Sequence, residues 1–292
     1  MIQAGLLPIL AGFPMTKPAP AALLAGLAAA GAAQPALAGE YSPFTPAPGS
    51  GSVDFNFVHI NSAEGLIVDA GGERLTLNSY QLSLSYGITE AVAFDGRIAF
   101  ADNDFVPQLG LPSNQDGLAD SFIGLRHRLL DEFSGAPLTL TAGLTGVIRG
   151  TYDVTRIDNL GDGGSGVQAG LSAGKFLTEK LAVTAEIGGR ARFNNVPEEF
   201  FYSAEAAYVF HERFSAWVGV AVANSVGGVE LGSPGFATLS FPALNEDSKL
   251  WQLGGQVKLA KNWHLSGSYG RRFNGENTAL GPFFRLGLSY GF

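Results

Sequence analysis

Hydrophobic and polar residues alternate along the chain from about residue 52 onward. In LWQLGGQVKL (250–259), an apolar residue occupies nearly every second position, and Gln, Gly or Lys stands between them. A period of two residues predicts β-strands with one apolar and one polar face. The pattern recurs at about 52–60, 74–86, 91–101, 118–129, 138–149, 165–177, 181–193, 200–210, 214–224, 250–259, 263–272 and 282–292. We therefore expect an all-β fold of about twelve strands.

The connections between these strands alternate in length. Those at 87–90, 178–180, 211–213 and 261–262 are tight, and 131–137 is the longest of the short set. Those at 61–73, 102–117, 151–164 and 225–247 are long and rich in Gly, Asn, Asp and Pro. This alternation is typical of a transmembrane up-and-down antiparallel β-barrel with short periplasmic turns and long extracellular loops.

A soluble β-sandwich or lipocalin-like barrel would show the same alternation. Three features favour the membrane barrel. The polar face consists mostly of Gly, Ser, Thr and Ala, and most Asp and Glu lie in the connections rather than on strands. Aromatic residues collect near both ends of the strands, as expected where a barrel crosses the two bilayer interfaces. The low charge content agrees with these three features, since charged residues make up only 15% of the chain, against roughly 25% in soluble domains.

The N-terminus carries the features of a secretory signal. An apolar stretch follows Lys17 and ends in Ala36-Leu37-Ala38, which is an A-x-A cleavage site. We expect residues 1–38 to be a signal peptide, with Met15 as a candidate true start because the first fourteen residues are uncharged. Residues 39–51 follow as a Pro-rich periplasmic linker, expected to be extended and mobile. Residues 52–292 form the outer-membrane β-barrel.

Two segments, DGLADSFIGLRHRLL (116–130) and SYGITEAVAFDGRIAF (85–100), each join a short turn to a strand. They resemble segments of a family of outer-membrane barrels, the MetA-pathway-of-phenol-degradation family. Gly117, Leu118 and Asp120 match a Gly-Leu-Gly-Asp-like turn of that family, while Ala119 departs from it, and residues 85–100 resemble its Tyr-Gly-Leu-Thr-Asp turn and the strand after it. The resemblance implies a transport protein, with aromatic or other apolar organic compounds as solutes. LGLSYGF (286–292) is similar to the aromatic-terminated strand of outer-membrane barrels at large, which implies that Tyr290 and Phe292 serve as an assembly signal.

Charged residues on the polar faces are directed into the lumen if the apolar faces meet lipid. Two interpretations of this inward set remain open. The charges could pair and plug the barrel, with Arg190, Glu186 and Glu205 as one cluster. Alternatively, unpaired arginines such as Arg272 and Arg285 could select solutes by charge and give a weak anion preference. The lumen and selectivity candidates are Arg97, Asp120, Arg126, Arg128, Arg149, Glu186, Arg190, Arg192, Glu205, Arg272 and Arg285.

These patterns predict a bacterial outer-membrane channel for small solutes that works by passive diffusion. The alternative is a structural or adhesive barrel with a plugged lumen. A lipid hydrolase is less favoured, because His264 and Ser266 face the lumen near a tight turn, and no catalytic residue is predicted. The chain has no cysteine and no cluster with metal-ligand spacing, so neither metal nor cofactor is expected. Its net charge of −8 argues against nucleic-acid binding. The expected partners are outer-membrane lipid, lipopolysaccharide, the outer-membrane assembly machinery and a small-molecule solute.

Overall fold

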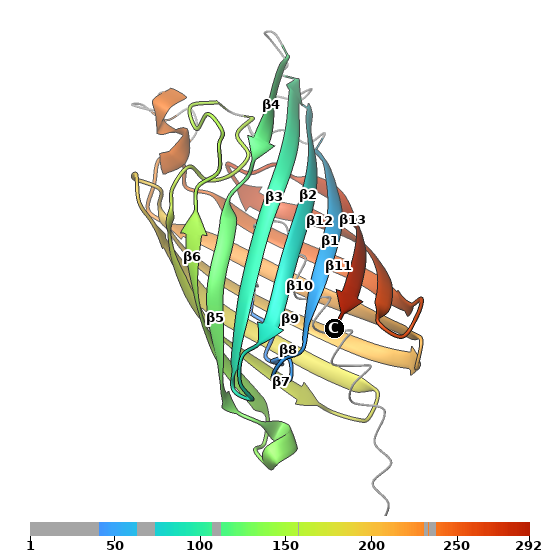
Figure 1. Cartoon of the computed structure of the whole chain (residues 1–292). Coiled ribbons are helices and arrows are strands. Elements are labelled where there is room, and N and C mark those ends of the chain that lie inside the picture. The colour runs from blue at the N-terminus through green and yellow to red at the C-terminus, as the bar shows by residue number, and fades with distance from the viewer. Residues whose placement is uncertain (1–40, 63–73, 107–111, 157, 231–232, 234–237) are drawn as a thin grey trace, which may run out of the picture.

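The protein folds as a closed antiparallel β-barrel (Figure 1). The computed structural model describes residues 41–62, 74–106, 112–156, 158–230, 233 and 238–292, so the expected signal peptide and Met15 lie outside the described residues. Each strand pairs with its neighbours in sequence, except that β4 and β5 both pair with β3 and not with each other, and the last strand returns to the first. The strands are β1 (Gly51–Ser62), β2 (Arg74–Gly87), β3 (Val92–Val106), β4 (Ser113–Leu118), β5 (Ser121–Leu130), β6 (Thr139–Ile148), β7 (Gly166–Phe176), β8 (Leu181–Arg192), β9 (Glu198–His211), β10 (Phe214–Val226), β11 (Asp247–Lys258), β12 (Trp263–Glu276) and β13 (Gly281–Gly291).

Short turns and long connections lie at opposite ends of the barrel. We call these the turn end and the loop end. The 3₁₀ helix η1 (Glu132–Ser134) lies at the turn end, and the 3₁₀ helix η2 (Thr238–Ala243) lies at the loop end (Figure 1). Among the described residues, no helix combines the length and hydrophobicity that crossing a bilayer requires.

In the described ranges, thirteen strand segments form a twelve-stranded barrel because β4 and β5 share one position in the wall. Both pair with β3: Leu118 of β4 lies opposite Phe100, and Phe122 of β5 lies opposite Arg97. Between them the connection after β6 meets the wall, where the backbone N–H of Thr151 donates to the carbonyl of Leu118 over 2.9 Å. The predicted number of strands is confirmed, but the single strand expected at 118–129 is interrupted.

The outward face of the barrel is apolar and the inward face is largely polar. On β6, Leu144 and Ile148 are 62% and 54% exposed, whereas Thr141 and Thr145 point inward and are 0% and 6% exposed. The alternation predicted for this strand is confirmed. An apolar surface of this extent is unfavourable in water and favourable against lipid tails.

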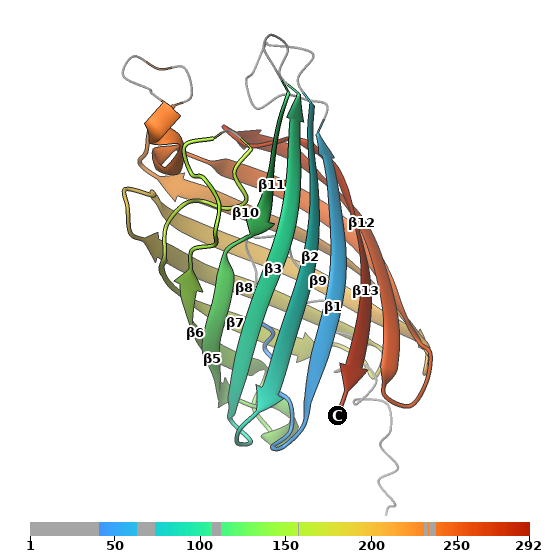
Figure 2. The same ribbon diagram turned by 45° about the horizontal axis from the view of Figure 1, so that its top comes forward.

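The barrel closes between β1 and β13 (Figure 2). Gly51 and Phe292 exchange two backbone hydrogen bonds of 3.0 Å each. The ring of Phe292 stacks on those of Tyr86 and Tyr290, with centroids 6.4 and 6.5 Å apart. Because both edges are paired, neither strand leaves backbone groups unsatisfied, as a lipid environment requires.

The N-terminal segment, residues 41–50, packs into the barrel instead of forming the mobile linker expected at 39–51. Tyr41 and Phe44 are only 5% and 4% exposed. The wall makes room for them with glycines on its inward face. A Cβ atom at Gly143 would lie 2.2 Å from the Tyr41 ring. The segment then crosses to β2, where Pro48 forms a bridge with Gly87, and enters β1.

Candidate functional site

The lumen is the candidate functional site, and the N-terminal segment narrows it toward the turn end. The Tyr41 hydroxyl donates to Thr145 Oγ1 over 2.9 Å, and the Tyr41 N–H donates to Glu186 Oε1 over 3.3 Å. Farther along, the Thr141 hydroxyl donates to the Pro43 carbonyl over 2.7 Å. Inward polar side chains of β6 and β8 therefore hold the segment in place.

Arg126 anchors the same segment from β5. Its Nη1 donates to the carbonyls of Ser42 and Phe44 over 2.7 and 3.2 Å. Its Nε and Nη2 form a bidentate pair with Asp95 at 2.5 and 2.9 Å. With every branch of the guanidinium engaged and only 4% of the residue exposed, Arg126 acts as a structural clamp. Arg128 lies nearer the rim, where it donates to the Glu90 carbonyl over 2.6 Å.

A second ionic cluster lies toward the loop end. Arg190 donates to Gln168 Oε1 over 2.8 Å and to Glu199 over 2.9 Å. Arg192 pairs with Asp120 at 2.6 Å and with Asp162 at 2.5 Å. Both arginine side chains are 1% exposed. These charges are paired, so they neutralise one another rather than attract solutes.

The expected cluster of Arg190, Glu186 and Glu205 does not form. The register of β8 and β9 places Arg190 opposite Glu199, Glu186 opposite Ser203, and Glu205 opposite Thr184. Glu186 instead binds the Tyr41 N–H. The three side chains lie on the inward face at different heights of the barrel.

Asp120 and Tyr152 fasten the connection after β6 to the break between β4 and β5. The Tyr152 hydroxyl donates to Asp120 Oδ1 over 2.6 Å and accepts from the Gly163 N–H over 2.9 Å. Burial of the ring, together with the negative charges of Asp120 and Asp162, raises the pKa of Tyr152. The hydroxyl therefore stays protonated as a donor through neutral pH. We call residues 149–165 the strap.

Arg149 does not face the lumen as expected. β6 ends at Ile148, and Arg149 begins the strap as an exposed residue. Its Nη2 donates to the Tyr152 carbonyl over 3.1 Å, and its guanidinium carbon lies 5.8 Å from the centroid of the Tyr152 ring. Strand alternation assigns a face only where the strand continues, which explains the error.

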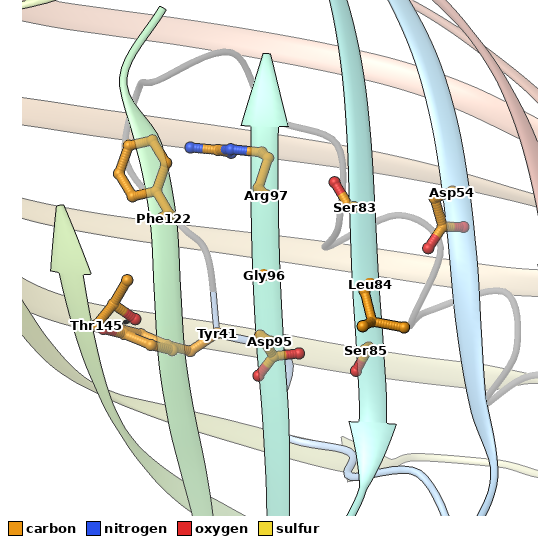
Figure 3. A pocket seen from close by; sticks show the side chains of 10 residues that line it. All are labelled: Tyr41, Asp54, Ser83, Leu84, Ser85, Asp95, Gly96, Arg97, Phe122 and Thr145. Atoms are coloured by element: carbon orange, nitrogen blue, oxygen red, sulfur yellow. Dashed lines mark hydrogen bonds between the residues drawn. The ribbon is translucent and has the colours of Figure 1, made fainter. Parts of the chain in front are cut away.

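A cavity of about 60 Å³ lies beside the N-terminal segment (Figure 3). Asp54, Ser83 and Arg97 border it from β1, β2 and β3, and Tyr41 lies at one side. The guanidinium of Arg97 stacks over the Phe122 ring with its carbon 4.1 Å from the centroid. Arg97 thus faces the lumen.

Arg272 and Arg285 lie on the neighbouring strands β12 and β13. The Nη1 of Arg272 donates to the Ala279 carbonyl over 2.7 Å. Arg285 is 3% exposed, and its Nη1 has no hydrogen-bond partner. Within the described ranges, no group of three His, Asp or Glu residues is arranged to hold a metal ion.

Apolar side chains also line part of the lumen. We call this group the apolar band. It lines one side of the lumen, from β1, β9, β10, β11 and β13, between the level of Arg285 and the loop end. Sequence reasoning missed it because its members interrupt the polar face. Its wall residues are Val58, Ile60, Phe201, Ala221, Ala223, Leu250 and Phe283.

Comparison with known proteins identifies the fold. No family model matches the chain, and no curated protein matches it. The COG4313 outer membrane channel from Pseudomonas putida F1 aligns with 85% of this chain and 96% of its own, with a TM-score of 0.65 and 16% identity. The KdgM porin aligns with 82% and 99%, with a TM-score of 0.51 and 11% identity. The translocator domain of autotransporter NalP from Neisseria meningitidis aligns with 85% and 90%, with a TM-score of 0.50 and 12% identity. At these identities the likeness establishes the barrel fold.

Proposed function

We propose that this protein is an outer-membrane channel through which small solutes diffuse. The observation that carries the proposal is a closed barrel with an apolar outward face and a lumen lined by polar and charged side chains. Such a barrel is stable in lipid and offers solutes a polar route. Structures of the same fold include proteins described as a channel and a porin.

The solutes proposed are small aromatic or other apolar organic compounds. The apolar band supports this assignment, because it gives such compounds a favourable surface inside the barrel. The N-terminal segment and the paired arginines restrict the free cross-section, so passage is limited to small molecules. Arg285, whose Nη1 is unpartnered, supports a weak preference for anions.

Planar-bilayer recording of the purified, refolded protein tests the channel. We expect discrete conductance steps and, in a salt gradient, a reversal potential of the sign given by anion preference. Clear cation selectivity would contradict the role assigned to the lumen arginines. Absence of conductance at all voltages would instead support the second candidate, a structural or adhesive barrel. That candidate is favoured by Tyr41 and Phe44, whose buried side chains fill the turn end of the lumen.

A lipid-hydrolase function has no geometric support at the histidine that was considered for it. His264 lies opposite Ser289 and Lys258, near the turn end of β12 and on its lumen side. A phospholipid ester in the bilayer does not reach that position.

We further propose that the protein reaches the outer membrane after removal of residues 1–38 and that the assembly machinery recognises Tyr290 and Phe292. Lipid and lipopolysaccharide would then surround the apolar outward face. N-terminal sequencing of the protein from purified outer membranes tests the cleavage, and a mature chain that begins before Ala38 would contradict it.

A further inference from the structure

Three unpartnered donors lie close together on consecutive strands of the lumen wall. They are the Nδ2 of Asn56 on β1, the Nη1 of Arg285 on β13 and the Oγ of Ser268 on β12. Their residues are 2%, 3% and 8% exposed. Buried donors without partners are unfavourable by about 1–3 kcal/mol each, and native structures pair nearly all of them. A ligand that supplies hydrogen-bond acceptors would therefore be stabilised at this wall.

The strand register brings the three donors together. Arg285 lies directly opposite Ser268 on β12. On the other side, Asn56 lies opposite Gly287, two residues from Arg285 on the same inward face. Since Gly287 carries no side chain, nothing on β13 separates Asn56 from Arg285. The donors thus come from adjacent positions of three neighbouring strands.

The apolar band adjoins these donors on the loop-end side. Val58 lies opposite Arg285, and Ile60 lies opposite Phe283, which is the next inward residue on β13. Val58, Ile60 and Phe283 are 1%, 8% and 4% exposed. Going from the loop end inward, the same two strands therefore present first an apolar surface and then hydrogen-bond donors with one positive charge.

We propose that this wall is a binding site for a small amphipathic carboxylate, meaning an aromatic or aliphatic body that carries one carboxylate group. The carboxylate accepts hydrogen bonds from Arg285, Ser268 and Asn56, while the body lies against Val58, Ile60 and Phe283. The proposal rests on the proposed channel function and narrows its solutes from apolar compounds to their carboxylates.

Neighbouring acidic residues leave the positive charge available. Asp54 and Glu205 are the electrostatic partners of Arg285, but neither forms an ion pair with it within 4 Å among the described residues. Asp54 already accepts a hydrogen bond from the Ser52 hydroxyl over 2.9 Å. A solute carboxylate that approaches Arg285 directly gains a charge-assisted contact that the resting protein lacks.

Binding to the folded full-length protein in detergent micelles tests the site without requiring an open pore. Isothermal titration calorimetry would use benzoate as the probe and benzamide as its uncharged analogue. We expect benzoate to bind better than benzamide. Arg285→Gln should weaken benzoate binding at least about tenfold, as expected for the loss of a hydrogen bond to a charged group. Benzamide binding should change little.

Matched variants distinguish binding at this site from attraction by the overall electrostatic potential of the lumen. Arg272→Gln removes the same charge from the neighbouring strand and should leave benzoate binding within about twofold of wild type. Val58→Thr keeps the side-chain shape and should weaken benzoate but not acetate. If Arg285→Gln fails to fold, judged by heat-modifiable mobility in SDS gels, then Ser268→Ala replaces it, with an expected loss of about threefold.

Three outcomes would overturn the proposal. These are benzoate binding that Arg285→Gln leaves unchanged, an equal loss in Arg272→Gln, and inorganic phosphate binding as tightly as benzoate. Bilayer conductance of the same preparations is scored separately. A protein that conducts but does not bind benzoate would refute the binding site and leave the channel proposal intact. A protein that binds benzoate but does not conduct would support the binding site and refute the channel proposal.

Discussion

Replacing Tyr152 with phenylalanine should release the strap from the barrel wall. The change removes one oxygen and leaves the ring, which is 5% exposed, in place. Asp120 loses a hydrogen bond of 2.6 Å, and the Gly163 N–H loses its acceptor at 2.9 Å. Asp120 keeps its pair with Arg192, so the barrel itself should remain closed.

The size of the effect follows from those contacts. A hydrogen bond to a charged group contributes about 1.5–3 kcal/mol. A loss of about 2 kcal/mol raises the population of the opened strap by about 30-fold. Because the strap opens locally, the free energy of global unfolding should change much less.

Trypsin reports this opening, since the strap contains Arg156, whose side chain is held by Asp158 at 2.6 Å and is 38% exposed. When opening and closing are fast, the rate of cleavage follows the population of the open form. We expect cleavage after Arg156 to accelerate by about 30-fold in Tyr152→Phe. Asp120→Asn should also accelerate cleavage. Because both substitutions weaken the same Tyr152–Asp120 hydrogen bond, the free-energy change in the double variant should be smaller than the sum of the two single changes.

Tyr208→Phe provides the control, because Tyr208 lies on the outward face near the turn end and is 39% exposed. It should cleave at the wild-type rate. Equal cleavage rates in Tyr152→Phe and wild type would refute the strap as a fastened element. Equal acceleration in Tyr208→Phe would show that loss of any tyrosine hydroxyl loosens the barrel.

Three further predictions concern the lumen, the seam and pH. Gly143→Val should displace Tyr41, since a Cβ there would lie 2.2 Å from the ring. Single-channel conductance should then rise, whereas Gly146→Val, with only an ordinary contact at 3.7 Å, should behave as wild type. Phe292→Ala removes a ring stacked at the β1–β13 seam and should reduce the folded, heat-modifiable fraction in outer membranes; unchanged levels would contradict this. Because the pKa of Tyr152 is raised in the folded state, its contribution to stability is complete below the ordinary value of about 10 and declines above it. Trypsin sensitivity of the strap should therefore increase above about pH 10 in wild type and much less in Tyr152→Phe.

The faces of the strands could be predicted from sequence because lipid on one side imposes a strict period of two. β6 shows this, since Leu144 and Thr145 take opposite sides as expected. The break between β4 and β5 leaves only a shift in the alternation, because Leu118 faces outward at an even position while Ile123 and Leu125 face outward at odd ones. That shift alone does not show what interrupts the strand. The interruption depends on Thr151, which comes from a different connection and bonds to the wall there.

To predict which lumen charges pair, one must know the register between neighbouring strands, and the alternation of residues does not give that register. The turn between β8 and β9 sets it. Asn194 and Asn195 adopt φ values of 66° and 60°, a conformation that asparagine tolerates better than most residues. The resulting hairpin sets Arg190 against Glu199. Without knowledge of that turn, the sequence pattern places Glu199 in a loop rather than on a strand.

The position of Tyr41 inside the barrel could not be predicted from the sequence either. Gly143 and Gly170 on the inward faces of β6 and β7 make room for its ring. A glycine on a lumen face is also typical of a site that simply lowers bulk or permits curvature. Only contacts between segments far apart in the chain distinguish a seat for a ring from an empty position.

The seam between β1 and β13 joins residues as distant as Ser52 and Gly291. Loop-closure entropy grows only with the logarithm of the enclosed length, so this contact is roughly 2 kcal/mol less favourable than a neighbouring hairpin. The seam offsets that with a ladder from Ser52 to Ile60. We therefore expect closure of the barrel to be a slow, high-contact-order step of folding rather than a thermodynamically weak contact. The barrel should unfold cooperatively, with no stable open sheet.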